Sequence, residues 1–313
     1  SSFGAWLDAS TDRIKEYACY AGLAAGYAGG GPDIWLLAAA TLTLQTTRHT
    51  TDYTFTLVSN VREGAVEPVP LDQPQDRFGP ADQPAVPSRP WARWARKAMH
   101  MPIGERWFVI SVTALVGSAR WVFTALLTLG LAALTYTTTI RLLRSRRWAD
   151  VSATDRERAV IRAQLDRGPL ASALARVLPW RLPVGRFVWL VPPALRLLEY
   201  GTVIVVVHAV APDAMPAAFA LLFAVAYHHY DALYRVLNGL RPVGALHAAG
   251  LGVEGRLLVV LALAASGEEA LSRGLVVLAA AFAVLFVGVG TVGGWQALRS
   301  SGGRVRFEEA VNA

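Results

Sequence analysis

The sequence is poor in cysteine and in charged residues, and both shortages narrow the classes of protein that it can encode. The single cysteine, Cys19, excludes an internal disulfide framework. Charged residues make up only 17% of the 313 residues, whereas 54% are hydrophobic. The apolar residues come in blocks of about 20, the length that crosses the hydrocarbon core of a bilayer. The composition therefore predicts an all-α polytopic membrane protein and argues against a soluble domain.

The chain also lacks an initiator methionine and any signal peptide with a basic start and a small-residue cleavage site. It begins at Ser1, directly before a helix that carries chemically interesting residues. We therefore expect the chain to be the later part of a longer protein.

Apolar blocks separated by breakers predict about eight transmembrane helices joined largely as hairpins. The expected spans are 5–29, 33–58, 105–117, 120–141, 187–210, 216–238, 252–266 and 271–296. The stretch 59–103 is rich in Pro, Asp, Gln and Arg, and cannot bury enough apolar surface to fold alone. We expect a solvated loop there.

The formal net charge is +7, but the basic residues gather at the ends of apolar blocks, as Arg141 and Arg144 do. This pattern follows the positive-inside rule and does not call for a nucleic-acid partner. The connections on one side carry most of the Lys and Arg, whereas the other side has little beyond Arg120 and Arg273. The bias predicts a multi-pass plasma-membrane protein whose first helix begins at the cytoplasmic face.

Two aspartates stand four residues apart in that first helix. On a helix, Gly4, Asp8 and Asp12 fall on one face, one turn apart. Carboxylates at the edge of a span are costly without a partner. A divalent ion such as Mg²⁺ suits two such oxygen ligands, but Arg13 and Lys15 could also pair with them. The spacing leaves both readings open.

The pattern Gly4-x3-Asp8-x3-Asp12 followed by Arg13 resembles the second half of the signature of the CDP-alcohol phosphotransferases. In that family DxxDGxxAR is followed, after eight residues, by GxxxDxxxD. The first half is absent from this sequence. We therefore expect two further aspartates upstream of Ser1, and we expect the chain as given to hold metal poorly and to turn nothing over.

The resemblance also divides the chain. Residues 1–141 are similar to the last four spans of a CDP-alcohol phosphotransferase core. Residues 142–185 then form a cytoplasmic linker with a surface helix. Residues 186–313 resemble an uncharacterised four-span membrane domain found on some actinobacterial members, a resemblance that implies no chemistry.

The resemblance implies that an acceptor hydroxyl attacks the β-phosphate of a CDP-linked alcohol and that CMP leaves, in phospholipid or polyol-phosphodiester synthesis. It assigns metal binding to Asp8 and Asp12, with Mg²⁺ or Mn²⁺ as the cofactor. Asp12 would also be the general base, and Gly4 would leave room for the nucleotide. The acceptor is a lipid or a polyol phosphate. A homodimer surrounded by membrane lipids is expected, and no nucleic acid is.

Two arginines in or beside the spans are candidates for acceptor binding. Arg48 and Arg106 could each bind a phosphate with two nitrogens of the guanidinium. The alternative is that Asp52 or Glu105 pairs with a neighbouring arginine, which would make burial tolerable.

The stretch AYHHYDALYR permits a metal site, since His228 and Asp231 could share a helical face, but the stretch offers too few ligands. We favour an Asp231–Arg235 pair, with the Tyr and His side chains at the headgroup level. Arg196 and Glu199 are also spaced as a helical pair.

Two rival functions stay open. One is a transporter with an ion path through Asp8, Asp12, Arg48 and Glu199. The other is a non-catalytic membrane scaffold.

Overall fold

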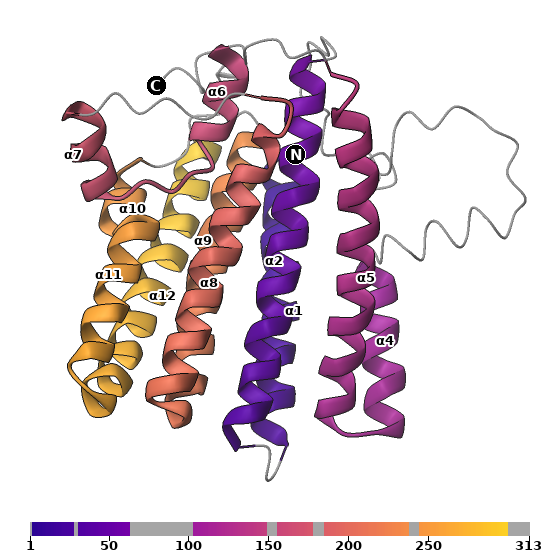
Figure 1. Cartoon of the computed structure of the whole chain (residues 1–313), viewed down its shortest axis with the longest axis vertical. Coiled ribbons are helices and arrows are strands. Elements are labelled where there is room, and N and C mark those ends of the chain that lie inside the picture. Colours follow the sequence, from indigo (N-terminus) through magenta and orange to yellow (C-terminus); the bar gives the residue numbers. More distant parts are fainter. Residues whose placement is uncertain are drawn as a thin grey trace, which may run out of the picture.

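The chain is described here by a computed structural model that covers residues 2–27, 31–62, 103–148, 155–177, 185–237 and 244–299. The elements of these ranges are helices, without any strand (Figure 1). The predicted all-α class is therefore confirmed for the part of the chain that is described. The predicted loop at 59–103 lies almost wholly outside the described residues.

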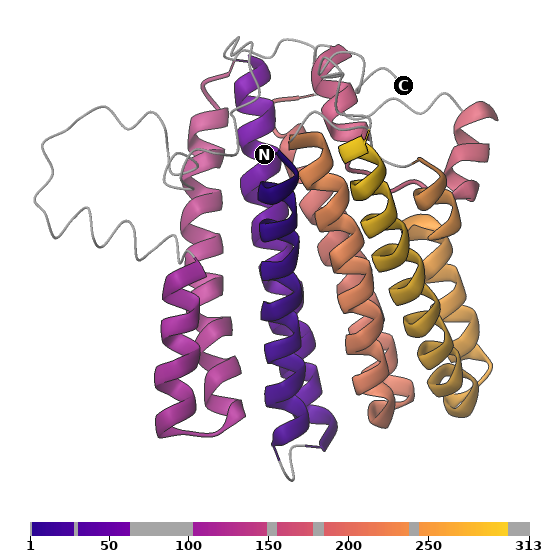
Figure 2. The same cartoon turned by 180° about the vertical axis from the view of Figure 1, so that it is seen from behind.

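The helices are α1 (Ser2–Gly26), α2 (Gly31–Arg62), α4 (Ile103–Val116), α5 (Ala119–Ser145), α6 (Asp155–Arg162), α7 (Pro169–Val177), α8 (Val191–Val210), α9 (Met215–Leu237), α10 (Gly244–Ala249), α11 (Gly252–Ala265) and α12 (Glu268–Arg299). The long helices lie side by side (Figures 1 and 2). The pairs α4–α5, α8–α9 and α11–α12 turn at one end of the bundle. Helix α6 and the start of α1 lie toward the opposite end (Figure 1).

Membrane character is clearest in three helical stretches. Residues Ala119–Ser145, Val188–Val210 and Glu268–Gly288 are long and apolar enough to cross a bilayer, among the described residues. The finer prediction of about eight spans is not confirmed. Helix α2 is long enough but lines its buried face with seven threonines and Arg48, and α4 and α11 have only 14 residues each.

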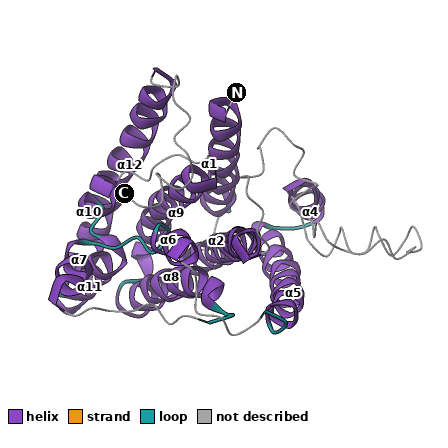
Figure 3. Cartoon of the chain, turned by 90° about the horizontal axis from the view of Figure 1, so that it is seen from above, coloured by secondary structure: helices purple, strands orange, loops and turns teal. Residues whose placement is uncertain are grey.

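Helix α2 holds the bundle together. It packs against α5 on one side and against α8 and α9 on the other, as the view from above shows (Figure 3). One apolar core contains Tyr17 of α1, Leu42 of α2, Phe123 of α5 and Phe219 of α9. Helices from both predicted four-span units therefore contribute to one core around α2. The boundaries at 141 and 185 stay predictions.

Helix α6 buries its apolar face, as an amphipathic surface helix should. Val160 and Ile161 are fully buried and belong to two small clusters that include residues of α2. Arg62 at the end of α2 pairs with Glu157, and Thr54 donates a hydrogen bond to Gln164 (2.7 Å) just beyond α6. The linker after α5 is thereby attached to α2 through both apolar and polar contacts.

Candidate functional site

Asp12 lies in the first half of α1, a helix whose start lies toward the end of the bundle that also carries α6 (Figure 2). Helix α1 runs without interruption through positions 4, 8 and 12. The backbone therefore provides the one-turn spacing that the sequence predicts for Gly4, Asp8 and Asp12. The surroundings of Gly4 and the side chain of Asp8 lie outside the described residues.

The Asp12 carboxylate is accessible. Its side chain is 32% exposed, and Lys15 Nζ lies 3.5 Å from its Oδ1 on a side chain that is itself 65% exposed. Pairs of this kind contribute little and exchange readily with solvent. Lys15 thus pairs with Asp12, as the alternative reading of the sequence expects, whereas Arg13 contacts Glu16, His49 and Tyr230. A carboxylate in this state is available to an incoming cation.

Arg13 belongs instead to a buried cluster around Glu16. Arg13 Nη1 donates to Glu16 Oε2 (2.5 Å), Tyr20 donates to Oε1 (2.7 Å), and Arg106 Nη2 from α4 donates to Oε2 (3.2 Å). Each of these side chains is buried. Glu16 is therefore the anion that makes two guanidiniums tolerable inside the bundle.

The structure places the two candidate acceptor-binding arginines inside this region. Arg106 forms the ion pair with Glu16, and its partner is not the neighbouring Glu105 that the sequence suggested. Arg48 is buried and donates to Gln45 Oε1 (3.1 Å). Asp52 pairs with Arg141 of α5, a helix that sequence reasoning did not connect with it.

Carboxylates from two helices lie among these arginines. Arg13 and Arg106 pair with Glu16, and Asp52, which pairs with Arg141, also attracts the Arg48 guanidinium. His49 Nε2 lies 2.7 Å from Arg13 Nη1. The buried ion pairs of Glu16 therefore lie on the same helix as the accessible Asp12 carboxylate.

A second buried polar cluster is centred on Asp166, in the loop between α6 and α7. Asp166 Oδ1 lies 3.2 Å from His228 Nε2, and its Oδ2 lies 2.9 Å from His229 Nε2. Arg256 Nη2 of α11 donates to Oδ2 (2.5 Å), and its Nε donates to Glu199 Oε1 (2.6 Å). The backbone of Asp166 is left-handed (φ 43°), an uncommon conformation that aspartate tolerates better than most residues.

In this Asp166 cluster the histidines of AYHHYDALYR contact protein partners, while their place at the headgroup level stays a prediction. His228 and His229 are buried. Both contact the Asp166 carboxylate, which lies 62 and 63 positions earlier in the chain. Asp231 is buried too, while the Arg235 side chain of its predicted pair lies outside the described residues. The predicted Arg196–Glu199 pair is present, with Nη1 and Oε2 3.9 Å apart.

The Asp166 cluster is balanced in charge. Asp166 and Glu199 face Arg196 and Arg256, so the two carboxylates meet two guanidiniums. Within the described ranges, no group of three or more His, Cys, Asp and Glu side chains is arranged to hold a metal ion. The arrangement is that of a structural lock between the linker and the helices α8, α9 and α11.

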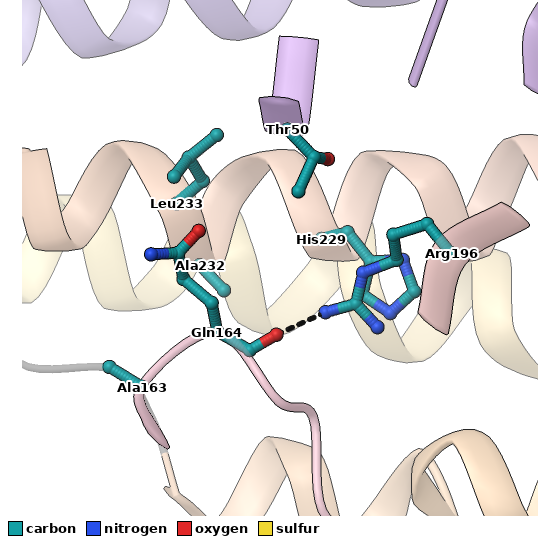
Figure 4. A pocket seen from close by; sticks show the side chains of 7 residues that line it. All are labelled: Thr50, Ala163, Gln164, Arg196, His229, Ala232 and Leu233. Atoms are coloured by element: carbon teal, nitrogen blue, oxygen red, sulfur yellow. Dashed lines mark hydrogen bonds between the residues drawn. The ribbon is translucent and has the colours of Figure 1, made fainter. Parts of the chain in front are cut away.

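A small cavity borders this cluster (Figure 4). It is lined by Thr50, Ala163, Gln164, Arg196, His229, Ala232 and Leu233. Arg196 Nη2 donates to the backbone oxygen of Gln164 (2.5 Å) across its edge. The cavity offers about 10 Å³, space for roughly one water molecule and far too little for a nucleotide or a lipid headgroup.

Comparison with known proteins bears on the second cluster but not on the first. Residues 169–301 match a family of unknown function (DUF5941). The match covers less than half of the chain and takes in α7 to α12. No curated protein and no solved structure matches the chain. That part of the chain is thus similar to a family that carries no known chemistry, and Asp166 lies just before it.

Proposed function

We propose that the chain is the C-terminal part of a CDP-alcohol phosphotransferase. It would transfer a phosphoalcohol or phosphatidyl group from a CDP-linked alcohol to an acceptor hydroxyl and release CMP. The proposal rests on the GxxxDxxxD pattern and on one structural observation. Asp12 stays accessible beside an exposed lysine, whereas the buried carboxylates of Glu16, Glu199 and Asp166 are each engaged by arginine.

The residues present fit a divalent ion. Asp8 and Asp12 offer hard oxygen ligands one helical turn apart, and the Asp12 carboxylate is open to exchange. A Mg²⁺ or Mn²⁺ ion, when bound, would neutralise the diphosphate and the departing CMP. A complete ligand set in this proposal needs further aspartates, which the resemblance assigns to a segment ahead of Ser1.

The chemistry asked of Asp12 is proton removal. The acceptor oxygen forms a bond to the β-phosphorus, the bond from that phosphorus to the CMP oxygen breaks, and CMP leaves with the electron pair. The proton of the acceptor hydroxyl passes to the Asp12 carboxylate. Gly4, two turns earlier on α1, would let the nucleotide approach the helix backbone.

The acceptor class rests on the family resemblance and on the chemistry of arginine. Arg48 and Arg106 are both buried in the bundle, and a guanidinium can bind a phosphate with two of its nitrogens. We propose a polyol phosphate as the acceptor class and keep a lipid hydroxyl as the alternative.

The proposed setting is the plasma membrane, with the site facing the cytoplasm and the protein acting as a homodimer among membrane lipids. The support for this orientation is the positive-inside bias. Arg62, Arg144 and Arg162 lie at helix ends on the side of α6, and Arg120 and Arg273 lie near the turns at the opposite end. The homodimer rests on the family resemblance alone.

The test is an assay of CMP release by the full-length parent protein in membranes, with radiolabelled CDP-alcohols as donors. Asp12→Asn should lower the rate by about a hundredfold or more, the usual effect of losing a general base. Asp33→Asn is the matched control, because Asp33 is an exposed carboxylate at the far end of the bundle, in the first turn of α2. Equal rates for Asp12→Asn and wild type would overturn the proposal.

The transporter alternative needs ionisable groups that change their charge during a cycle. Glu199 is held by Arg256 at 2.6 Å within a charge-balanced cluster, so no described contact favours an ion path through it. A non-catalytic scaffold would release no CMP in the same assay.

A further inference from the structure

Helix α9, from the part of the chain that matches the family of unknown function, packs its aromatic side chains directly against α1 and α2. Phe223 meets Tyr17 of α1 edge to face, with ring centroids 5.4 Å apart. Tyr234 meets Tyr53 of α2, and their hydroxyl oxygens lie 2.7 Å apart. Between these contacts lies Tyr230, which is buried. The C-terminal bundle thus reaches the helix that carries Asp12.

Tyr230 contacts the residue that follows Asp12. The guanidinium carbon of Arg13 lies 5.2 Å from the centroid of the Tyr230 ring. The same ring meets His49 of α2 at 6.1 Å in a T-shaped arrangement, and His49 lies 2.7 Å from Arg13. With Glu16 on its other side, the Arg13 side chain is enclosed and only 5% exposed.

Arg13 and Asp12 are adjacent in one helix, so an Arg13 side chain held by its neighbours restrains the helical turn that also carries Asp12. A guanidinium removed from water gains most from an aromatic face, so the Tyr230 ring holds the Arg13 side chain in place. Arg13 in turn fixes the rotation of the α1 turn that presents the Asp12 carboxylate. Small displacements of a catalytic group are costly for rate.

We propose that Tyr230 is a positioning residue for Asp12 and acts on it through Arg13. The C-terminal bundle then supplies part of the support of the candidate active site. This inference rests on the proposed function for its catalytic consequence, but the contact itself can be tested without it.

Two substitutions separate positioning from simple packing. Tyr230→Phe keeps the ring that faces Arg13, whereas Tyr230→Leu keeps an apolar side chain but removes the ring. Phe219→Leu is the matched control: Phe219 is buried on the same helix and contacts Trp35 of α2 at 5.6 Å. It lies roughly 16 Å along the helix from Tyr230.

The experiment uses the full-length protein and two measurements. The first is the Mg²⁺ concentration that gives half the maximal rate of CMP release. Tyr230→Leu should raise it about tenfold or more, while Phe219→Leu stays within about twofold of wild type. Tyr230→Phe keeps the ring but loses the hydroxyl that also interacts with Arg13, so its effect should fall between the two. The second is deuterium uptake by the backbone amides of residues 11–20. Uptake should be fastest in Tyr230→Leu, intermediate in Tyr230→Phe and unchanged in Phe219→Leu.

The outcomes are distinct. Equal uptake and equal Mg²⁺ dependence in Tyr230→Leu and Phe219→Leu would overturn the inference. If the wild-type protein releases no CMP, the proposed function fails, and unchanged uptake in Tyr230→Leu would then overturn the contact as well. Faster uptake in Tyr230→Leu than in Phe219→Leu supports the contact in either case.

Discussion

Two aspartates of this chain lie in opposite surroundings. Asp12 is one-third exposed, and its carboxylate meets a lysine that is itself mostly in solvent. The Asp166 side chain is 1% exposed, and it is engaged by two histidines and by Arg256. The first carboxylate can exchange its partner for a cation at little cost, whereas the second cannot be altered without leaving several buried groups unpaired.

Under the proposed function, accessibility marks the carboxylate that does chemistry in this bundle, and burial and the number of contacts do not. Asp166 has more polar partners than Asp12, but those partners satisfy it and balance its charge. Asp12 has the accessibility that catalysis requires. We therefore assign a structural role to the region around Asp166 and the candidate chemistry to the region around Asp12.

The largest effect on stability should follow removal of Asp166. Asp166→Ala leaves His228, His229 and part of the Arg256 guanidinium without their acceptor, and should lower the free energy of unfolding by about 3–5 kcal/mol. Denaturant unfolding in detergent, followed by tryptophan fluorescence, measures this. Asp166→Asn should cost less, because asparagine tolerates the left-handed backbone and keeps an acceptor. A loss below about 1 kcal/mol in Asp166→Ala would contradict the lock.

A somewhat smaller loss is expected at Glu16. Glu16→Gln keeps the shape of the side chain but leaves Arg13 and Arg106 buried without their counter-ion. The free energy of unfolding should fall by about 3 kcal/mol. Glu269→Gln is the control, since Glu269 forms an ion pair with Arg273 that is more than three-quarters exposed. Equal small effects of the two variants would show that the Glu16 cluster does not stabilise the bundle.

The next largest loss of stability is expected where the backbone of Gly168, in the linker, approaches the backbone of Leu251. A Cβ at Gly168 would lie 1.9 Å from the backbone oxygen of Leu251, so the loop after α6 would have to shift. Gly168→Ala should cost about 2 kcal/mol. Gly201→Ala, in open space within α8, should instead stabilise by about 0.5–1 kcal/mol. A neutral Gly168→Ala variant would show that the linker is not held closely.

The smallest effect on stability belongs to Asp12. Asp12→Asn removes only an exposed pair with Lys15, so the free energy of unfolding should change by less than about 1 kcal/mol. The same unfolding measurement applies. A loss as large as that of Asp166→Ala would erase the contrast between the two aspartates and would give Asp12 a structural role.

The sequence was informative where the signal is local. Hydrophobic blocks and breakers located the hairpins α4–α5, α8–α9 and α11–α12, and the i, i+4 spacing placed Asp8 and Asp12 on one helix. The Arg196–Glu199 pair was also visible, because its two residues stand three apart on one helix. Local periodicity carries such information without reference to the rest of the chain.

The residues that pair with each other in the two buried clusters could not be predicted in the same way. Glu16 pairs with Arg106 across 90 positions, and Asp166 meets His229 across 63. One signal was present: a charged residue inside an apolar block needs a partner, and Glu16 is such a residue. Nothing in the sequence pattern said which arginine would satisfy it, or that Tyr230 would lie over Arg13.

The number of membrane spans could not be fixed from the sequence for a related reason. Helix α2 is the most central helix, and its buried threonines donate to its own backbone carbonyls, as Thr43 does to Ala39 (2.8 Å). Such bonds satisfy several of its hydroxyls within the helix, although mean hydropathy does not class α2 among the candidate spans.

The central proposal is that the Asp8 and Asp12 face of α1 holds a divalent cation during transfer of the phosphoalcohol or phosphatidyl group. The most direct measurement is a change of metal preference in the full-length protein. Asp8→Cys replaces a hard oxygen by a soft thiolate, so CMP release should be lost with Mg²⁺ and partly restored by Cd²⁺, whereas Asp33→Cys keeps its Mg²⁺-dependent activity. Full activity of Asp8→Cys with Mg²⁺, or the same response to Cd²⁺ in both variants, would contradict the claim.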